Sequence, residues 1–283
     1  MVFESLIKAK TAEKRPWIVF LLGILYSSIG IIFGLWLFKN DASIFVVSVI
    51  VFASIPLMYN IIKLEEKKDR SELRERALLG EHKKALTSFI ALFFGVLVGL
   101  SGWYIFLPSD DINTLFSSQL REVNLVEKEF SGNIVKPDDF GRIFLNNFRV
   151  LAFTFIFSFF LGAGAIFILT WNASLIAVAI GSFVRENLAI FSNNLGFGVW
   201  GAYFGSFSYG LAGYMLHGIF EIAAFFIAGL AGGIISVAVI RHDLFSKRFK
   251  KIISDSLWLI GLSIIVLLFA AFVESFMSPR LFS

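Results

Sequence analysis

Residues Pro16–Phe38 read PWIVFLLGILYSSIGIIFGLWLF, a stretch without a charged side chain that is long enough to cross the hydrocarbon core of a bilayer as a helix. The whole chain is 57% hydrophobic and only 16% charged, which excludes an ordinary soluble domain. Because the apolar runs are continuous and do not alternate, they also exclude a membrane β-barrel. The sequence therefore predicts an all-α membrane protein with about seven transmembrane helices: Pro16–Phe38, Ala42–Ile62, Thr87–Leu107, about Phe148–Trp171, Ala173–Val184 extending to about Ile190, His217–Ile240 and Ser256–Phe276.

The Lys and Arg residues indicate the orientation of these spans, since cytoplasmic loops carry an excess of them. Seventeen lie in Met1–Arg15, Lys63–Leu86 and Arg241–Lys251, and seven lie in the segments on the opposite side. We therefore expect a cytoplasmic N-terminus and an outside C-terminus in a multi-pass protein of the plasma membrane. The net charge of +4 is explained by these flanks, so the expected partner is the lipid bilayer and not a nucleic acid.

The placement of charge also divides the chain into three parts. Residues 1–62 form a two-helix membrane hairpin, residues 63–86 form a charged cytoplasmic helical segment, and residues 87–283 form a five-helix membrane core. An outer loop at 108–142 is the largest polar region of that core and can carry one or two short helices. We expect this loop and the segment 63–86 to act as docking surfaces.

Between Asn187 and Ile240 the ionisable side chains are His217 and Glu221 alone. The tract is too long for one span, but two crossings would place the basic segment after it on the outside. Residues 191–216 are therefore expected to form an interfacial or re-entrant segment before the sixth span.

His217 and Glu221 are four residues apart and lie on one face of a helix. Charged residues inside a span usually face the bundle interior, because exposure to lipid is costly. A structural polar lock is the favoured interpretation, with catalysis or ion handling as the alternative. Asn146, Asn147 and Arg149 begin the fourth span and could pair with Glu221 across the bundle.

Glycines mark the places in the core where helices are expected to approach one another closely, and an asparagine marks an expected turn. The chain is expected to turn sharply at Asn172, between the fourth and fifth spans, and this residue is also a candidate member of the polar cluster. Small residues let helix backbones approach closely in lipid. The glycines expected to serve this purpose are Gly162 and Gly164 in the fourth span and Gly218, Gly229, Gly232 and Gly233 in the sixth.

Signatures of an enzyme are missing from the sequence. It contains no cysteine, no H-E-x-x-H or G-x-S-x-G motif and no P-loop. The other histidines, His82 and His242, lie in charged cytoplasmic segments and cannot complete a metal site with His217. We expect no catalytic residue, no metal and no cofactor.

The successive motifs NNFRVLAF, FFLGAGAIFILTWNASLIAVAIG and LHGIFEIAAFFIAGLAGG resemble the stage II sporulation protein M family. The resemblance covers about Thr87–Phe276 and implies that the first two spans are an addition to a five-span unit. In spore-forming bacteria it implies a membrane scaffold that works with cell-wall-cutting partners during engulfment. The matching positions are Asn146, Asn147, Arg149, Gly162, Gly164, Asn172, His217, Gly218, Glu221, Ala223, Gly229 and Gly232.

Taken with this resemblance, the residues predict a non-enzymatic integral membrane protein. We expect a scaffold or subunit of a cell-envelope complex with other envelope membrane proteins as partners. The alternative is a transporter or permease that uses His217 and Glu221 to line a pathway. The oligomeric state stays open.

Overall fold

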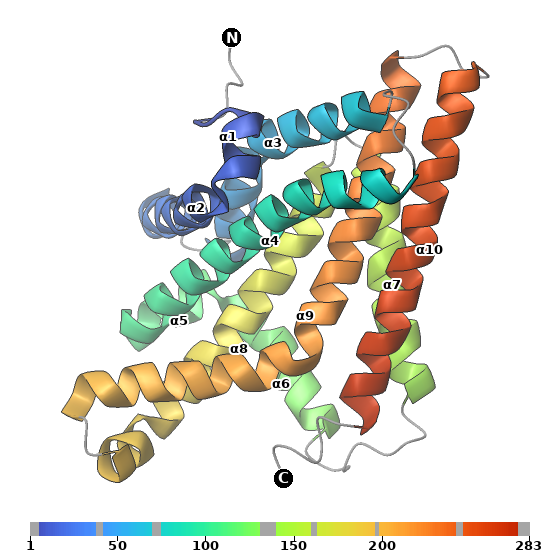
Figure 1. Ribbon diagram of the computed structural model, residues 1–283. Helices are drawn as coiled ribbons and strands as arrows, with labels where there is room; N and C mark the ends of the chain where they lie inside the picture. The colour runs from blue at the N-terminus through green and yellow to red at the C-terminus, as the bar shows by residue number, and fades with distance from the viewer. Residues whose placement is uncertain are drawn as a thin grey trace.

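A computed structural model describes residues 6–37, 42–69, 75–130, 140–159, 163–195, 198–241 and 246–276. Inside these ranges the side chains at 66–69, 75–81, 125–130, 163–164, 191, 193–195, 216–217, 241 and 248 fall outside the description. The described chain is entirely helical in its regular structure (Figure 1). Its helices are α1 (Ala9–Lys14), α2 (Pro16–Leu37), α3 (Ala42–Asp69), α4 (Glu75–Phe106), α5 (Ser109–Leu115), α6 (Ser117–Phe130), α7 (Phe140–Ser158), α8 (Ala163–Leu195), α9 (Gly198–Arg241) and α10 (Lys247–Phe276).

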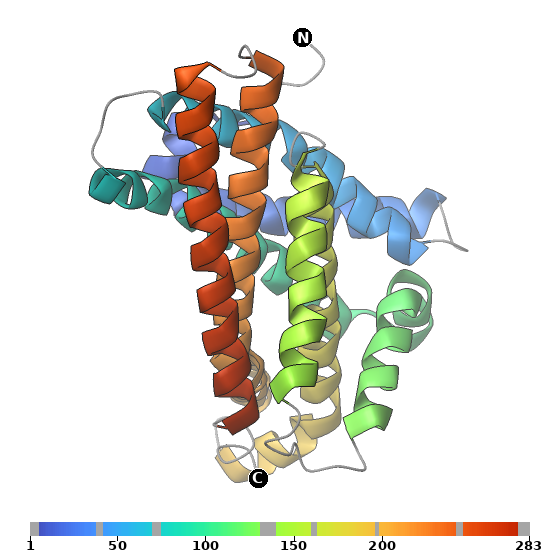
Figure 2. The same ribbon diagram turned by 90° about the vertical axis from the view of Figure 1, so that its right-hand side faces the viewer.

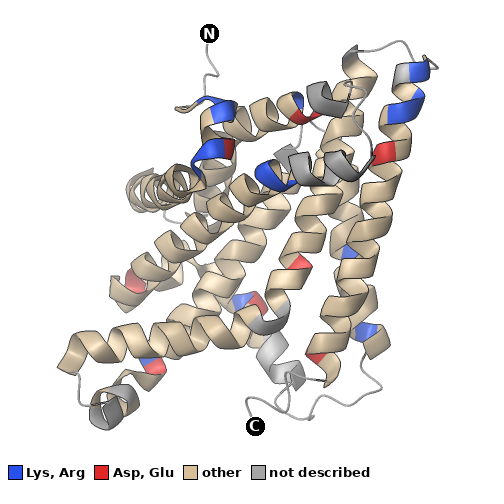
Figure 3. Cartoon of the chain, viewed as in Figure 1, with Lys and Arg blue, Asp and Glu red and all other residues tan. Residues whose placement is uncertain are grey.

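Within the described ranges, 7 helices are long and apolar enough to cross a membrane, which confirms the predicted number. In Figures 1 and 2, α7, α9 and α10 run alongside one another, while α2 crosses their direction. Lys and Arg gather mainly at the end of the molecule where the N-terminus, the start of α4 and the start of α10 lie (Figure 3). The candidate spans are Pro16–Leu37, Ala42–Glu65, His82–Phe106, Phe140–Ser158, Ala165–Ile190, Gly218–Ile240 and Phe249–Phe276.

The predicted boundary between the fourth and fifth spans is wrong. Helix α7 ends at Ser158, and α8 runs without interruption from Ala163 through Asn172. The side-chain amide of Asn172 donates to the backbone oxygen of Ile168 at 2.9 Å, one turn earlier in the same helix. An asparagine that bonds within its own helix does not end it, so no turn forms there.

The fourth span accordingly begins earlier than predicted, at Phe140. The polar residues Asn146, Asn147 and Arg149 lie inside this span and not at its start. Gly164 belongs to the first turn of α8, and Gly162 lies outside the described residues. The error came from treating a polar group as a flank, although a span can carry polar side chains that find partners in neighbouring helices.

Helix α9 is 44 residues long and bends. In Figure 1 its first part lies across the lower end of the molecule and then turns into the span that begins at Gly218. One side of this first part packs on α8, where Gly210 faces Phe183. Trp200 and Phe204 on another side are 78% and 76% exposed. This arrangement suits a helix lying in the membrane interface, one of the two possibilities expected for 191–216.

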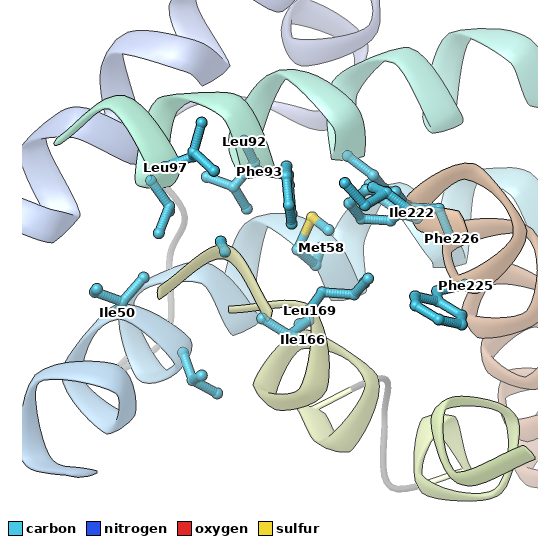
Figure 4. Packing of buried hydrophobic residues seen from close by; sticks show 14 of the residues in the cluster. Ile50, Met58, Leu92, Phe93, Leu97, Ile166, Leu169, Ile222, Phe225 and Phe226 are labelled. Carbon is cyan, nitrogen blue, oxygen red and sulfur yellow. The ribbon is translucent and has the colours of Figure 1, made fainter. Parts of the chain in front are cut away.

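The core of the molecule lies where α3, α4, α8 and α9 meet (Figure 4). Met58 of α3 lines the same small cavity as Phe93 of α4, Leu169 of α8 and Phe226 of α9. Phe93 and Phe226 meet edge to face, with ring centroids 6.1 Å apart. The first two spans therefore share one apolar core with the rest of the chain.

The outer loop begins with two helices, α5 and α6, while residues 131–139 lie outside the described residues. Leu115 at the end of α5 and Phe116 between the two helices are almost fully buried. The amide nitrogen of Gln119 donates to the hydroxyl of Ser174 on α8 at 3.2 Å. This part of the loop is thus fixed onto the outer end of the bundle.

Candidate functional site

The polar residues inside the spans meet where α7, α9 and α10 come together near their outer ends. The amide nitrogen of Asn147 on α7 donates to Oε1 of Glu221 on α9 at 2.6 Å. The carboxyl group of Glu274 on α10 lies within hydrogen-bonding reach of Glu221 as well. All three side chains are half-buried. We call Asn147, Glu221 and Glu274 the outer polar cluster.

The chemistry of this cluster follows from its donors and acceptors. Two carboxylates offer only acceptors, so a hydrogen bond between Glu221 and Glu274 requires a proton on one of them. The amide of Asn147 supplies a second donor to Glu221. Each contact joins a different pair of helices, so the cluster fastens α9 to α7 on one side and to α10 on the other.

Some of the expected members of this cluster are elsewhere. Asn147 was one of three residues predicted to pair with Glu221, and it does so. The other two, Asn146 and Arg149, are exposed, while Asn172 bonds within its own helix. His217 lies in α9, but its side chain is outside the described residues. The pairing of His217 with Glu221 therefore stays a prediction.

Glu274 is the member that was missed from the sequence. It lies in the last turn of α10, only two residues before the span ends at Phe276, where an acid is easily interpreted as interfacial. A signal was present, because an ionisable residue inside an apolar span usually has a partner. The identity of that partner could not be deduced, since Glu221 and Glu274 lie far apart in the chain.

The glycines of α9 mark its contacts with three other helices. A Cβ at Gly229 would lie 3.3 Å from Ala165 of α8, and one at Gly233 would lie 2.9 Å from Ile62 of α3. A Cβ at Gly232 would collide with Ser158 at the end of α7. Gly218 has only the flexible end of Met215 nearby, at 3.7 Å. Within this set, Gly232 and Gly233 are the positions where another helix leaves least room.

A second buried polar pair lies at the opposite end of the bundle. Nδ1 of His82 on α4 is 2.6 Å from Oε2 of Glu65 on α3, and both residues are almost completely buried. His82 was predicted only to lie in a charged segment, and its burial against α3 was not foreseen. The two residues lie at the ends of their spans, where the pair joins α3 to α4.

Arg185 of α8 forms a third polar contact between helices. Its guanidinium donates to the backbone oxygen of Leu107 at 2.9 Å and to that of Tyr104 at 3.3 Å. The last carbonyls of a helix lack partners within it, and a cation near them is favourable. Arg185 therefore caps the end of α4 and connects it to α8.

Two cavities lined by described residues inside the bundle are small and apolar. They have volumes of about 20 and about 10 Å³, and both are lined by Met58, Phe89 and Phe226 among other residues. A larger hollow of about 440 Å³ lies along α10 beside Trp258. The outer polar cluster lines none of these three spaces. The described residues also contain no group of three His, Cys, Asp or Glu side chains able to hold a metal ion.

An all-helical chain with seven apolar helices and polar groups paired between them is an integral, multi-pass membrane protein. A family model described as Stage II sporulation protein M matches residues 88–279. The chain belongs to this family, and its first two spans precede the matched region. The comparisons with curated proteins and with solved structures find no match.

Proposed function

We propose that this protein is a non-catalytic scaffold or subunit of a cell-envelope complex in the plasma membrane. The observation that carries the proposal is the pairing of its membrane-embedded polar groups with one another. Asn147, Glu221 and Glu274 connect three helices, and His82 and Glu65 connect two more. Polar groups used in this way hold a bundle together, and they supply neither a nucleophile with its base nor a metal site among the described residues.

The outer helices α5 and α6 are the surface we assign to an envelope partner. Phe116 anchors them to the bundle, while Arg121, Glu122 and Asn124 of α6 are exposed. A rigidly held helix with a polar outer face can bind a partner without the entropic cost of ordering a loop. The cytoplasmic segment 63–86 is the second docking surface in this proposal.

Membership in the family supports an envelope role of this kind. The family's description names sporulation, and we limit the proposal to the coarser role of membrane scaffold. The partners in the proposal are other membrane or envelope proteins.

The test is affinity purification from mild detergent followed by mass spectrometry. The wild type is compared with Arg121→Ala/Glu122→Ala on the exposed face of α6 and with Glu221→Gln in the outer polar cluster. The Gln variant keeps the size of the side chain and is first checked for its unfolding temperature. We expect an envelope protein that is lost from the α6 variant and retained by Glu221→Gln.

A permease is the second candidate, and the contact between Glu221 and Glu274 favours it, because a carboxyl pair can bind and release a proton. The two small apolar cavities lined by described residues offer little polar lining for a solute. The test measures proton or solute flux in proteoliposomes. If the wild type shows flux, folded Glu221→Gln shows none and no partner is captured, the permease proposal replaces the scaffold proposal.

A further inference from the structure

The short helix α1 and the residues that flank it carry four cations at one end of the bundle. Lys8, Lys10, Lys14 and Arg15 are all exposed, while Ala12 between them is fully buried. Helix α1 contacts α2, α3 and α4, so Ala12 seats it across the point where these helices meet. Figure 3 shows the basic residues at this end of the molecule. The cations are thus presented on a fixed surface and not on a free tail.

Among the described residues of α1 the acid is Glu13, which is half-buried, against four exposed cations. None of Lys8, Lys10, Lys14 or Arg15 has an ion-pair partner within the described part of the chain. Glu65, the described acid of α3, is already bonded to His82. The described residues of this surface therefore carry a net positive charge.

The surface lies directly before two candidate spans, where lipid headgroups are expected. Arg15 directly precedes the span that begins at Pro16, and the span of α4 begins at His82, followed by exposed Lys83. Trp17 is 60% exposed in the first turn of α2. Tryptophan concentrates at membrane interfaces, where its ring lies among headgroups and the upper acyl chains. One surface thus combines phosphate-binding cations with an interfacial aromatic ring.

We propose that α1, with the first turns of the α2 and α4 spans, binds anionic phospholipid headgroups of the cytoplasmic leaflet. A phosphate offers only acceptors, and each lysine offers three donors with a full positive charge. The leaflet's negative surface potential attracts basic residues near it by about 1 kcal/mol each. An acidic protein segment would satisfy the same charges, but the neighbouring exposed Trp17 at the start of a span favours lipid. The site is independent of the scaffold role.

The experiment measures the binding of phosphatidylglycerol and of phosphatidylcholine with the same acyl chains to the full-length protein in neutral detergent, by native mass spectrometry. The variant Lys10→Gln/Lys14→Gln removes two charges from α1. The matched control, Lys247→Gln/Lys250→Gln, removes two exposed charges from the start of α10 at the same end of the molecule. A charge-preserving variant, Lys10→Arg/Lys14→Arg, separates loss of charge from loss of fold.

We expect the wild type, the α10 variant and the Arg variant to prefer phosphatidylglycerol. The α1 Gln variant should lose about fivefold in affinity for each charge removed, the equivalent of about 1 kcal/mol. Added salt should weaken the preference. The proposal is overturned if the wild type shows no preference, if the α1 variant keeps it, or if the α10 variant loses it equally. Displacement of the lipid by an acidic protein segment at α1 would also overturn it.

Discussion

Gly95 is the position where the contact between α2 and α4 can be tested most sharply. A Cβ at Gly95 would collide with the backbone oxygen of Phe20 and would lie 2.9 Å from its carbonyl carbon. From the other side, a Cβ at Gly23 would lie 2.7 Å from the backbone oxygen of Leu92. The obstructing atoms belong to backbones, which cannot rotate away as a side chain can. Gly95→Ala must therefore push the two helices apart.

The size of the effect follows from that displacement. Carbon atoms pack best at about 3.5–4.0 Å, so the two helices have to separate by about 1 Å. A gap of that size removes up to about half of the dispersion energy between the atoms affected. Overpacking of a well-packed contact typically costs about 1–3 kcal/mol. Alanine returns about 0.5–1 kcal/mol, because it favours a helix over glycine. We expect Gly95→Ala to lower the free energy of unfolding by about 1–2 kcal/mol.

Gly102, two turns further along α4, provides the matched control. No atom of a neighbouring helix lies within 4 Å of a Cβ built there, so Gly102→Ala should be neutral or stabilise by up to about 1 kcal/mol. Unfolding of each variant is followed by circular dichroism during titration of mild-detergent micelles with dodecyl sulfate. Equal stability of the two variants, or a more stable Gly95→Ala, would refute the close contact of α2 with α4.

Three further predictions concern the polar groups and α9. In a double-mutant cycle of unfolding free energies, the effects of Asn147→Ala and Glu221→Ala should depart from additivity by at least about 0.5 kcal/mol. The effects of Arg149→Ala and Glu221→Ala should add within about 0.5 kcal/mol. A large coupling of Arg149 to Glu221 would contradict the described cluster. His82→Ala should lower the free energy of unfolding by about 3–5 kcal/mol, because it leaves the carboxyl group of Glu65 buried without this partner. An unchanged unfolding midpoint would count against the pair. Because the chain has no cysteine, single cysteines introduced along the first part of α9 can each carry a nitroxide label whose depth in the bilayer is measured. The depths should oscillate with the helical period around one value. A steady change in depth along the helix would instead indicate a re-entrant segment.

The comparison of sequence with structure is most instructive at the fourth and fifth spans. Their existence was predictable from apolar composition, but their boundary was placed at Asn172, and the helix instead breaks after Ser158. Polar residues can lie inside a span when a neighbouring helix supplies a partner, as Glu221 does for Asn147. Such a partner cannot be identified from the span's own residues, so the sequence pattern misplaced the boundary.

The candidate site was predictable to a similar degree. Glu221 and Asn147 were both singled out, because ionisable and amide groups are costly in lipid. Glu274 was not, and neither was the pair of His82 with Glu65. The glycines of α9 stood out by their spacing, whereas Gly23 and Gly95 are single residues in two different spans whose importance appears only when the helices are seen in contact.

By itself the sequence determined that this chain crosses a membrane with seven helices, and it indicated which end faces the cytoplasm. These properties depend on the length, hydrophobicity and flanking charge of each segment, all of which are local. Only the tertiary structure decided which polar groups meet, where α9 bends across the end of the bundle, and which glycines bring α2 against α4. Those features depend on the relative position and register of helices far apart in the chain, and in lipid this is set by the packing and hydrogen bonding of whole surfaces.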